Sequence, residues 1–280
     1  MGEKKRISSE MNWRIFFIFI LLALIFLGCR QSKYETIKVE KDSQVTREIF
    51  DVKKYPALTA VGKINFIGQR WCSLVLVSED IAVSAGHCFL GNNLKFDLSK
   101  DFEPFWTVVI FRENGVKKIE NVSVKRVLKA EMNPDYAIVR LNRKITGIKP
   151  LKVSILTLDE MRANEANLGC AGFNGDKELG DDGWTMTISR NIKIVPETNS
   201  KSRVDATCIS TYGGSGGLFF EERTNAETNL KEYDFIGVVW GVTDEKYNEQ
   251  GKLVKDENVV TSITPVSTFF KALNEIIGEK

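Results

Sequence analysis

Short apolar segments separated by turns fill the sequence after residue 54, and they constrain the fold more than any other feature. They are CSLVLVS, IAVSA, FWTVVIF, NVSVKRVL, YAIVRL, WTMTISRNIKIV, GLFF and FIGVVWGV. They are rich in β-branched and aromatic residues, and turns such as GNN, RENG, NPD and FNGD lie between them. This pattern favours an all-β barrel or sandwich over alternating strands and helices.

Helix is predicted only at the end of the chain, over residues 265–278. Thr264 can cap this helix, and Pro265 suits its first position. Apolar residues recur there at helical spacing, at Val266, Phe269, Phe270, Leu273, Ile276 and Ile277. We interpret this stripe as a packing surface.

The amino terminus has the pattern of an export signal. An unbroken apolar run over residues 15–27 follows four basic residues, Lys4, Lys5, Arg6 and Arg14. The run is shorter than the roughly 20 residues of a membrane-spanning helix, and its basic flank is typical of a secretory signal. The run ends in FLGC, which resembles the lipobox of bacterial lipoproteins, in which the cysteine is lipidated and becomes the new amino terminus.

The predicted organisation has three parts: a signal peptide over residues 1–28, a lipid-modified Cys29 with a flexible tether over residues 29–53, and a folded domain over residues 54–280. An uncleaved membrane anchor is the alternative. Met11 is a second candidate start, because Arg14 alone supplies a short basic region. Either way we expect an exported protein of the bacterial cell envelope, held on the periplasmic or cell-surface face of a membrane.

Four cysteines remain once Cys29 is assigned to the lipid: Cys72, Cys88, Cys170 and Cys208. An even number in an exported chain predicts two disulfides, and three pairings are open. Zinc is the rival interpretation. No two of these cysteines have CxxC spacing, however, and the only histidine is adjacent to one of them. We therefore expect disulfides, with no metal and no cofactor.

Charge excludes one class of partner. The chain has 39 basic and 37 acidic residues and a net charge of +2, with no basic block beyond the leader. Proteins that bind nucleic acid carry a basic patch to neutralise phosphates, so we expect no nucleic-acid partner.

Three short motifs carry residues suited to one chemistry. The only histidine, His87, lies in SAGHC and is a candidate general base, because imidazole titrates close to neutral pH. In TYGGSGGLF, Ser215 lies between glycine pairs, which let the backbone bend tightly and direct N–H groups at one point. In NPDYAIVRL, Asp135 lies at a turn before an apolar strand, where it can orient the imidazole. Each motif alone is also compatible with a structural role.

Together these motifs resemble the trypsin-like serine proteases of the chymotrypsin fold. SAGHC is similar to the family's T-A-A-H-C, DYAIVRL to D-I-A-L-L-x-L, and GGSGGLF to G-D-S-G-G-P-x, in the family's order. FIGVVWGV is similar to the strand that lines the family's substrate cleft. The likeness covers residues 54–278. It implies two packed antiparallel β-barrels, at about 54–150 and 151–265, with a short C-terminal helix.

The resemblance implies a serine endopeptidase that acts on protein or peptide substrates through an acyl-enzyme. Ser215 would be the nucleophile, His87 the general base and Asp135 the group that orients it. The N–H groups of Gly213 and Ser215 would form the oxyanion hole.

The resemblance also implies the disulfide pairing around the histidine. Cys72 stands 16 residues before Cys88, as in the family's disulfide around its catalytic histidine. We expect the remaining pair, Cys170–Cys208, in the second barrel.

Two glycines depart from the family pattern. Gly86 replaces an alanine, and Gly214 replaces the aspartate that receives the ammonium freed by propeptide cleavage in activated trypsin-like enzymes. An Ile-Val-Gly-Gly start before YPALTAVGKI is also missing, so we expect activity without propeptide removal. The alternative is a catalytically inactive, protease-like lipoprotein that acts as a binding or structural module. An α/β-hydrolase esterase is excluded, because its serine precedes the other two residues in the chain.

The expected substrate cleft has four residues: Ile209, Ser210, Trp240 and Gly241. Ile209 stands six places before Ser215, where trypsin itself carries the aspartate that binds basic side chains. Without that charge, we expect small or apolar residues before the cleaved bond. Asp244 or Glu245 in the following loop would restore a preference for basic residues if either reached the pocket.

Overall fold

The computed structural model describes residues 46–66, 71–90, 100–101, 107–113, 117–177, 179–195, 202–242, 246–247, 253–254 and 260–278. The predicted signal peptide, Cys29 and most of the tether lie outside these residues, as do Asp244 and Glu245. Within the described ranges, none of the helices combines the length and the apolar character of a membrane span.

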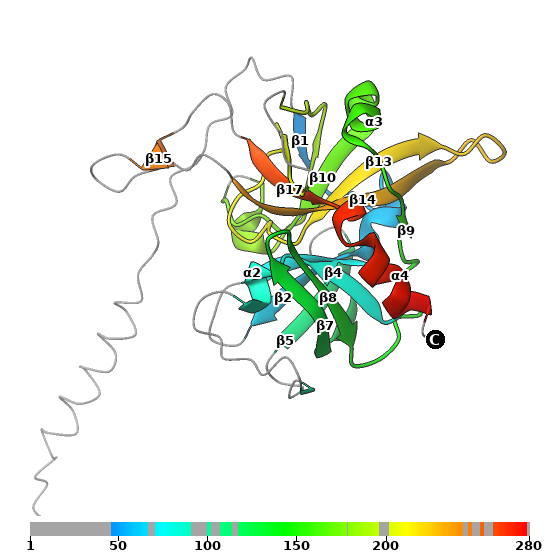
Figure 1. Ribbon diagram of the computed structural model, residues 1–280, viewed down its shortest axis with the longest axis vertical. Helices are drawn as coiled ribbons and strands as arrows, with labels where there is room; N and C mark the ends of the chain where they lie inside the picture. The colour runs from blue at the N-terminus through cyan, green and yellow to red at the C-terminus, as the bar shows by residue number, and fades with distance from the viewer. Residues whose placement is uncertain are drawn as a thin grey trace, which may run out of the picture. The chain divides into compact units, whose positions relative to one another are not determined.

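The first half of the domain is an antiparallel sheet, in the lower part of Figure 1. Its strands are β2 (Val61–Phe66), β3 (Trp71–Leu76), β4 (Ile81–Ser84), β5 (Thr107–Glu113), β6 (Lys117–Val122), β7 (Val124–Met132) and β8 (Asp135–Leu141). Their order is β6-β5-β2-β3-β4-β8-β7. Ser84 at the end of β4 pairs with Ala137 near the start of β8, so the turn after β4 lies beside the first residues of β8.

The second half is a larger sheet. Its strands are β1 (Thr46–Ile49), β9 (Lys152–Val153), β10 (Leu168–Gly172), β11 (Thr187–Arg190), β12 (Val204–Ala206), β13 (Leu218–Thr224), β14 (Lys231–Val242) and β17 (Thr261–Pro265). Their order is β1-β11-β10-β13-β14-β17-β12, and β9 pairs in parallel with β14. Two further strands, β15 (Lys246–Tyr247) and β16 (Leu253–Val254), pair with each other. The β13–β14 hairpin projects from the sheet (Figure 1).

The two sheets share one hydrophobic core. Fully buried Phe111 of the first sheet and Phe235 of the second belong to the same cluster. A smaller cluster lies within the second sheet and contains Cys170 and Cys208. The central strands are buried along nearly their whole length, as β4 and β10 show, because the sheets pack against each other and against the segments that cover them. The predicted all-β architecture of two packed antiparallel halves is confirmed.

The domain begins earlier than predicted, because residues 46–53 are not part of a flexible tether. β1 pairs antiparallel with β11, with Arg47 opposite Ser189. The N–H group of Phe50 donates to Met186 O at 2.9 Å, and its ring is buried. A four-residue strand gives little periodic signal, and its partner lies far along the sequence, so a local pattern could not reveal it.

Helix is not confined to the end of the chain. α2 (His87–Leu90) follows β4, and α3 (Leu158–Ala163) follows β9. α3 starts at a capping box: the Thr157 side chain accepts from Glu160 N–H, and the Glu160 carboxylate accepts from Thr157 N–H.

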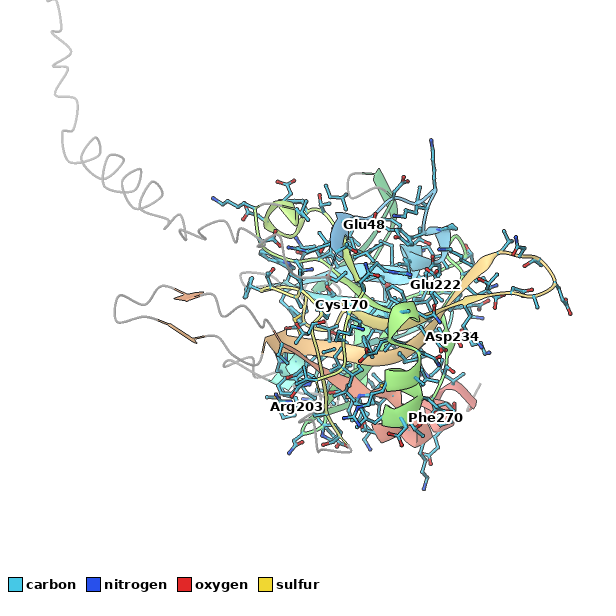
Figure 2. The ribbon with its side chains drawn as sticks, turned by 90° about the horizontal axis from the view of Figure 1, so that it is seen from above. Glu48, Cys170, Arg203, Glu222, Asp234 and Phe270 are labelled. Carbon is cyan, nitrogen blue, oxygen red and sulfur yellow. A yellow bond between two sulfur atoms is a disulfide. The ribbon has the colours of Figure 1, made fainter. Side chains whose placement is uncertain are left out.

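The C-terminal helix begins later than predicted. α4 (Phe270–Gly278) follows a short 3-10 turn over Val266–Thr268, and its first residue, Phe270, is labelled in Figure 2. Thr264 is not its cap, because it pairs with Val238 in the sheet. Its hydroxyl donates instead to Asp135 O at 3.0 Å.

Candidate active site

The pairing of β4 with β8 brings His87 to Asp135. The backbone N–H of His87 donates to Asp135 Oδ1 at 2.8 Å, and Nδ1 lies 2.6 Å from Oδ2. An ionised carboxylate only accepts hydrogen bonds, so Nδ1 carries the proton in this pair and Nε2 is left as the basic nitrogen. The carboxylate is 4% exposed and the imidazole 27%, so only the imidazole reaches the surface.

The segment around His87 is held by a disulfide and a glycine. The Cys72–Cys88 disulfide links β3 to α2, with Cα atoms 6.5 Å apart. A Cβ atom at Gly86 would collide with the backbone oxygen of Glu131, which is why the alanine of the family pattern does not fit here. His87 lies beside both sulfur atoms. Because these sulfurs are bonded to each other, they are not thiolate ligands for a metal.

Ser215 lies in a tight loop, residues 211–217, that we call the Ser215 loop. Gly213 and Gly216 have φ angles of +86° and +83°, which glycine adopts without strain. Several of its N–H groups donate within the protein: Thr211 to Asn174 Oδ1 at 2.7 Å, Gly214 to Thr211 O at 2.9 Å, Gly216 to Val239 O at 2.6 Å, and Gly217 to Gly214 O at 2.9 Å. In the described part of the chain, no acceptor takes the N–H groups of Gly213 and Ser215.

The direction of these two N–H groups follows from the carbonyls that precede them. Tyr212 O accepts from Gly175 N–H at 2.6 Å, and Gly214 O accepts from Gly217 N–H at 2.9 Å. In a planar trans peptide the N–H points opposite to the carbonyl. The N–H of Gly213 therefore points away from Gly175, and the N–H of Ser215 points away from Gly217.

Ser73 on β3 anchors the same loop from the first sheet. Its Oγ donates to Gly213 O at 3.1 Å, and its backbone N–H donates to Ser215 O at 2.7 Å. The same Oγ accepts from Phe173 N–H at 2.8 Å. Three backbone segments from both sheets therefore meet at one buried hydroxyl.

The Ser215 loop also touches the segment that carries His87. A Cβ atom at Gly216 would lie 3.1 Å from Ala85 N. The Ser215 hydroxyl, however, donates to Trp240 O at 3.5 Å, and His87 Nε2 lies 3.8 Å from Cys88 Sγ. Among the described residues no hydrogen bond joins Ser215 to His87. Such bonds are often long in a free enzyme and tighten when substrate binds.

Two of the predicted cleft residues, Ile209 and Ser210, line a narrow hollow at Gly214, which we call the Ile209 hollow. It is lined by Cys170, Ala171, Gly172, Asn174, Ile209, Ser210, Gly214 and Val239. None of these side chains is charged. Cys170 in this lining forms a disulfide with Cys208, with Cα atoms 6.3 Å apart. Both expected disulfides are therefore present.

Trp240 and Gly241 continue from the Ile209 hollow along β14. The guanidinium of Arg203, which Figure 2 labels, lies 5.4 Å from the centre of the Trp240 ring. A Cβ atom at Gly241 would meet nothing within 4 Å, so the strand is open there. Ile209 and Ser210 thus line the hollow, while Trp240 and Gly241 follow its lining residue Val239 along β14.

Comparison with known proteins agrees with this architecture. A sequence model of the family described as Trypsin matches residues 52–268. The chain belongs to the trypsin family. No curated protein matches it significantly in sequence. Among solved structures, one of a Glu endopeptidase in complex with MPD is similar, with 14% identity and a TM-score of 0.57. The match covers 85% of this chain and 99% of that one, and at this identity it shows the chymotrypsin-type fold alone.

Two residues that hold this trypsin-family site are absent from the predicted one. Ser73 follows Cys72 inside a strand whose sequence is typical of the core. Its place next to Cys72 is the only feature of the sequence that indicates a role in the site. Asn174 lies in FNGD, which reads as an ordinary turn. It is buried, and its Oδ1 accepts from Thr211 N–H at 2.7 Å. Both residues act through contacts with segments distant in sequence.

Replacing Ser73 by alanine tests its place in the trypsin-family site. Ser73→Ala leaves Gly213 O and Phe173 N–H without their partner in a buried position. We expect the free energy of unfolding to fall by about 1–3 kcal/mol in urea denaturation. We also expect the amides of the Ser215 loop to exchange hydrogen faster.

Ser123→Ala is the matched control. Ser123 is also buried, but its hydroxyl has no hydrogen-bond partner among the described residues. Its removal should leave stability unchanged or raise it slightly. Equal effects of the two substitutions would show that Ser73 does not anchor the Ser215 loop.

Proposed function

We propose that the chain is a serine endopeptidase that cleaves protein or peptide substrates. One observation carries this proposal: beside the hydrogen-bonded pair of His87 and Asp135 lies a loop that leaves the N–H groups of Gly213 and Ser215 free. Acyl transfer requires a base, a nucleophile and donors for the oxyanion, and these residues can supply all three.

The proposed reaction has two halves. Ser215 Oγ attacks the carbonyl carbon of the substrate while His87 Nε2 takes the hydroxyl proton, and Asp135 stabilises the resulting imidazolium. The tetrahedral intermediate collapses as the C–N bond breaks, and His87 gives its proton to the leaving amine. Water then attacks the acyl-enzyme with His87 as base, which releases the acid product and restores the Ser215 hydroxyl.

The N–H groups of Gly213 and Ser215 stabilise the negative oxygen of the tetrahedral intermediate. One such donor is typically worth about 3 kcal/mol, or about two orders of magnitude in rate. The donors contribute this much only if they are held in place before the reaction, so the contacts that fix the Ser215 loop matter as much as the three reacting side chains.

A non-catalytic binding module is the second candidate. The contact between the Ser215 hydroxyl and Trp240 O favours it, because this hydroxyl is not bonded to His87. The buried Asp135 favours catalysis. It accepts two hydrogen bonds from His87, an arrangement that orients an imidazole as a base. Covalent labelling of Ser215 separates the two candidates.

A serine-directed fluorophosphonate should label the exported full-length chain, because the probe traps a serine activated by a neighbouring base. Ser215→Ala should abolish labelling, and His87→Ala should slow it by at least about a thousandfold. Circular dichroism and thermal melting would show that both variants remain folded. The readout is the mass of the adduct and the rate of its formation.

Ser123→Ala is the control for this experiment and should be labelled at the wild-type rate. Absence of labelling in the folded wild-type chain would support the binding module. Undiminished labelling of Ser215→Ala would assign the reactive serine elsewhere.

We propose that a small or apolar side chain precedes the cleaved bond and packs at the Ile209 hollow, which is too narrow for a long side chain. Its lining carries no charge, and burial of a lysine or arginine without a counter-charge is unfavourable. A library of peptides should therefore be cut mainly after small or apolar residues, as identified by mass spectrometry of the products. Cleavage mainly after Lys or Arg would contradict a neutral pocket.

We propose that a lipid on Cys29 tethers the enzyme to a membrane of the bacterial cell envelope. The support is the basic, apolar leader that ends in FLGC, together with two disulfides, which are typical of exported proteins. Cys29→Ser should remove the lipid, so the chain should appear in the soluble fraction or keep its leader. Mature Cys29→Ser protein that is still retained in the membrane fraction would contradict lipid tethering.

A further inference from the structure

The Ser215 loop has no room for a side chain at Gly214. A Cβ atom there would collide with Ser210 Oγ and Asn174 Oδ1. The space beside Gly214, where the family pattern has an aspartate, is thus filled by the neutral amide of Asn174. Other groups must therefore fix this loop.

Asn174 connects the Ser215 loop to β11. Its Oδ1 accepts from Thr211 N–H at 2.7 Å, and its Nδ2 donates to Thr187 Oγ1 at 2.8 Å. Asn174 is buried, and the donor and acceptor ends of its amide are both used. The amide therefore has one orientation in which both hydrogen bonds form.

Arg47 of β1 reaches the same Thr187 hydroxyl. Its Nε and Nη2 each donate to Thr187 Oγ1 at 3.1 Å, and Nη2 also forms an ion pair with Asp176 Oδ2. The side chains of Arg47 and Asp176 are only 6% and 8% exposed. A buried arginine whose Nε and Nη2 are both hydrogen-bonded is more restricted than an arginine on the surface.

Asp176 carries a second route from Arg47 to the loop. Its Oδ2 accepts from Thr211 Oγ1 at 3.4 Å, and its Oδ1 accepts from the N–H groups of Leu179 and Gly180 at 3.0 and 3.3 Å. Burial raises the pKa of Asp176, but its bonds to Arg47 and to these two N–H groups outweigh burial, and the pKa lies below the usual range. Asp176 therefore stays ionised, and its charge is balanced by Arg47.

Both routes end at Thr211, which is held through three atoms. Its N–H is bound by Asn174 and its Oγ1 by Asp176, while its backbone oxygen accepts from Gly214 N–H at 2.9 Å. This last bond fixes the peptide next to Gly213 and Ser215. The position of Arg47 is thereby linked to the two N–H groups of the oxyanion hole.

We propose that Arg47 is a positioning residue of the active site, a cation built into β1 that sets the Ser215 loop through Asn174 and Asp176. This inference rests on the proposed endopeptidase function. It assigns to residues 46–49 the task of keeping the oxyanion hole formed without any cleavage of the chain. Loss of the cation leaves Asp176 as an unpaired buried charge, which drives the network apart.

Arg47→Met tests the proposal, because methionine keeps much of the side-chain length without the charge or the donors. We expect kcat on a peptide ester to fall about tenfold or more while KM changes less than about twofold, since oxyanion donors act on the transition state. Arg47→Lys keeps the cation and should restore part of kcat. In hydrogen exchange, amides of residues 211–217 should exchange faster in Arg47→Met.

Arg190→Met is the matched control. Arg190 lies on β11, and its Nη1 lies 2.6 Å from Glu222 Oε2, with side chains 16% and 11% exposed. This substitution also removes a largely buried ion pair from the second sheet, but Arg190 and Glu222 have no contact with Asn174, Asp176 or Thr211 among the hydrogen bonds and ion pairs described above. It should lower thermal stability while leaving kcat and the exchange of the Ser215 loop unchanged.

Thr187→Val provides a second test if Arg47→Met does not fold. Valine has nearly the same shape, leaves the Arg47–Asp176 ion pair in place and removes only the hydroxyl that joins Arg47 to Asn174. We expect it to lower kcat and to speed exchange in residues 211–217, with KM unchanged. Unchanged kcat and exchange in this folded variant would overturn the proposed connection from Arg47 through Thr187 and Asn174.

Further outcomes separate this inference from the proposed function. A wild-type chain that neither hydrolyses the ester nor reacts with fluorophosphonate would refute the endopeptidase, and hydrogen exchange would then decide the role of Arg47 alone. Faster exchange confined to Arg47→Met and Thr187→Val would support the loop anchor. Equal effects of Arg47→Met and Arg190→Met on kcat and exchange would show that Arg47 contributes only general stability.

Discussion

The site depends on hydrogen bonds that join the two sheets at a buried hydroxyl. Ser73 belongs to the first sheet, yet its Oγ and N–H bind the carbonyls on either side of Gly214, and Phe173 of the second half donates to the same Oγ. Apolar packing between the sheets is not directional and tolerates small shifts. Hydrogen bonds in a dry interior are directional, and leaving them unmade is costly. The relative position of His87 and the Ser215 loop is therefore set by a few polar contacts within an apolar core.

The glycines contribute to the same arrangement, in which close backbone packing brings segments together and hydrogen bonds orient them. Gly86 and Gly216 lie where one backbone approaches another too closely for a side chain, and Gly213 needs a positive φ beside the Trp71 ring. These close approaches let the His87 segment and the Ser215 loop meet without intervening side chains. Polar groups then fix the orientation of each peptide. Glycine at 214 serves the same end, because the neighbouring Asn174 amide takes the space of a side chain.

The residues of the proposed triad have a sequence signal because each lies in a short local motif. His87, Asp135 and Ser215 were identified from five to nine residues of sequence apiece, and the strands followed from β-branched segments between turns. Contacts between distant segments left no such signal. The partners of Arg47 lie 129 and 140 residues away, so residues 46–49 resemble a polar linker when read alone. The prediction that Thr264 caps the helix is wrong. Thr-Pro is a good helix start, but the β14–β17 ladder keeps Thr264 in the sheet.

The position of β1 has a consequence for the release of the domain from whatever precedes it. A cut before residue 46 frees a domain that keeps Arg47 in its contacts with Asp176 and Thr187. A cut between Phe50 and Tyr55 instead separates the strand from the rest of the chain, and β1 is then held by non-covalent contacts such as its pairing with β11 and the bond from Phe50 N–H to Met186 O. For the proposed tethered protease, release of the domain and loss of the Arg47 contacts would therefore require cuts at different points, only a few residues apart in the same segment.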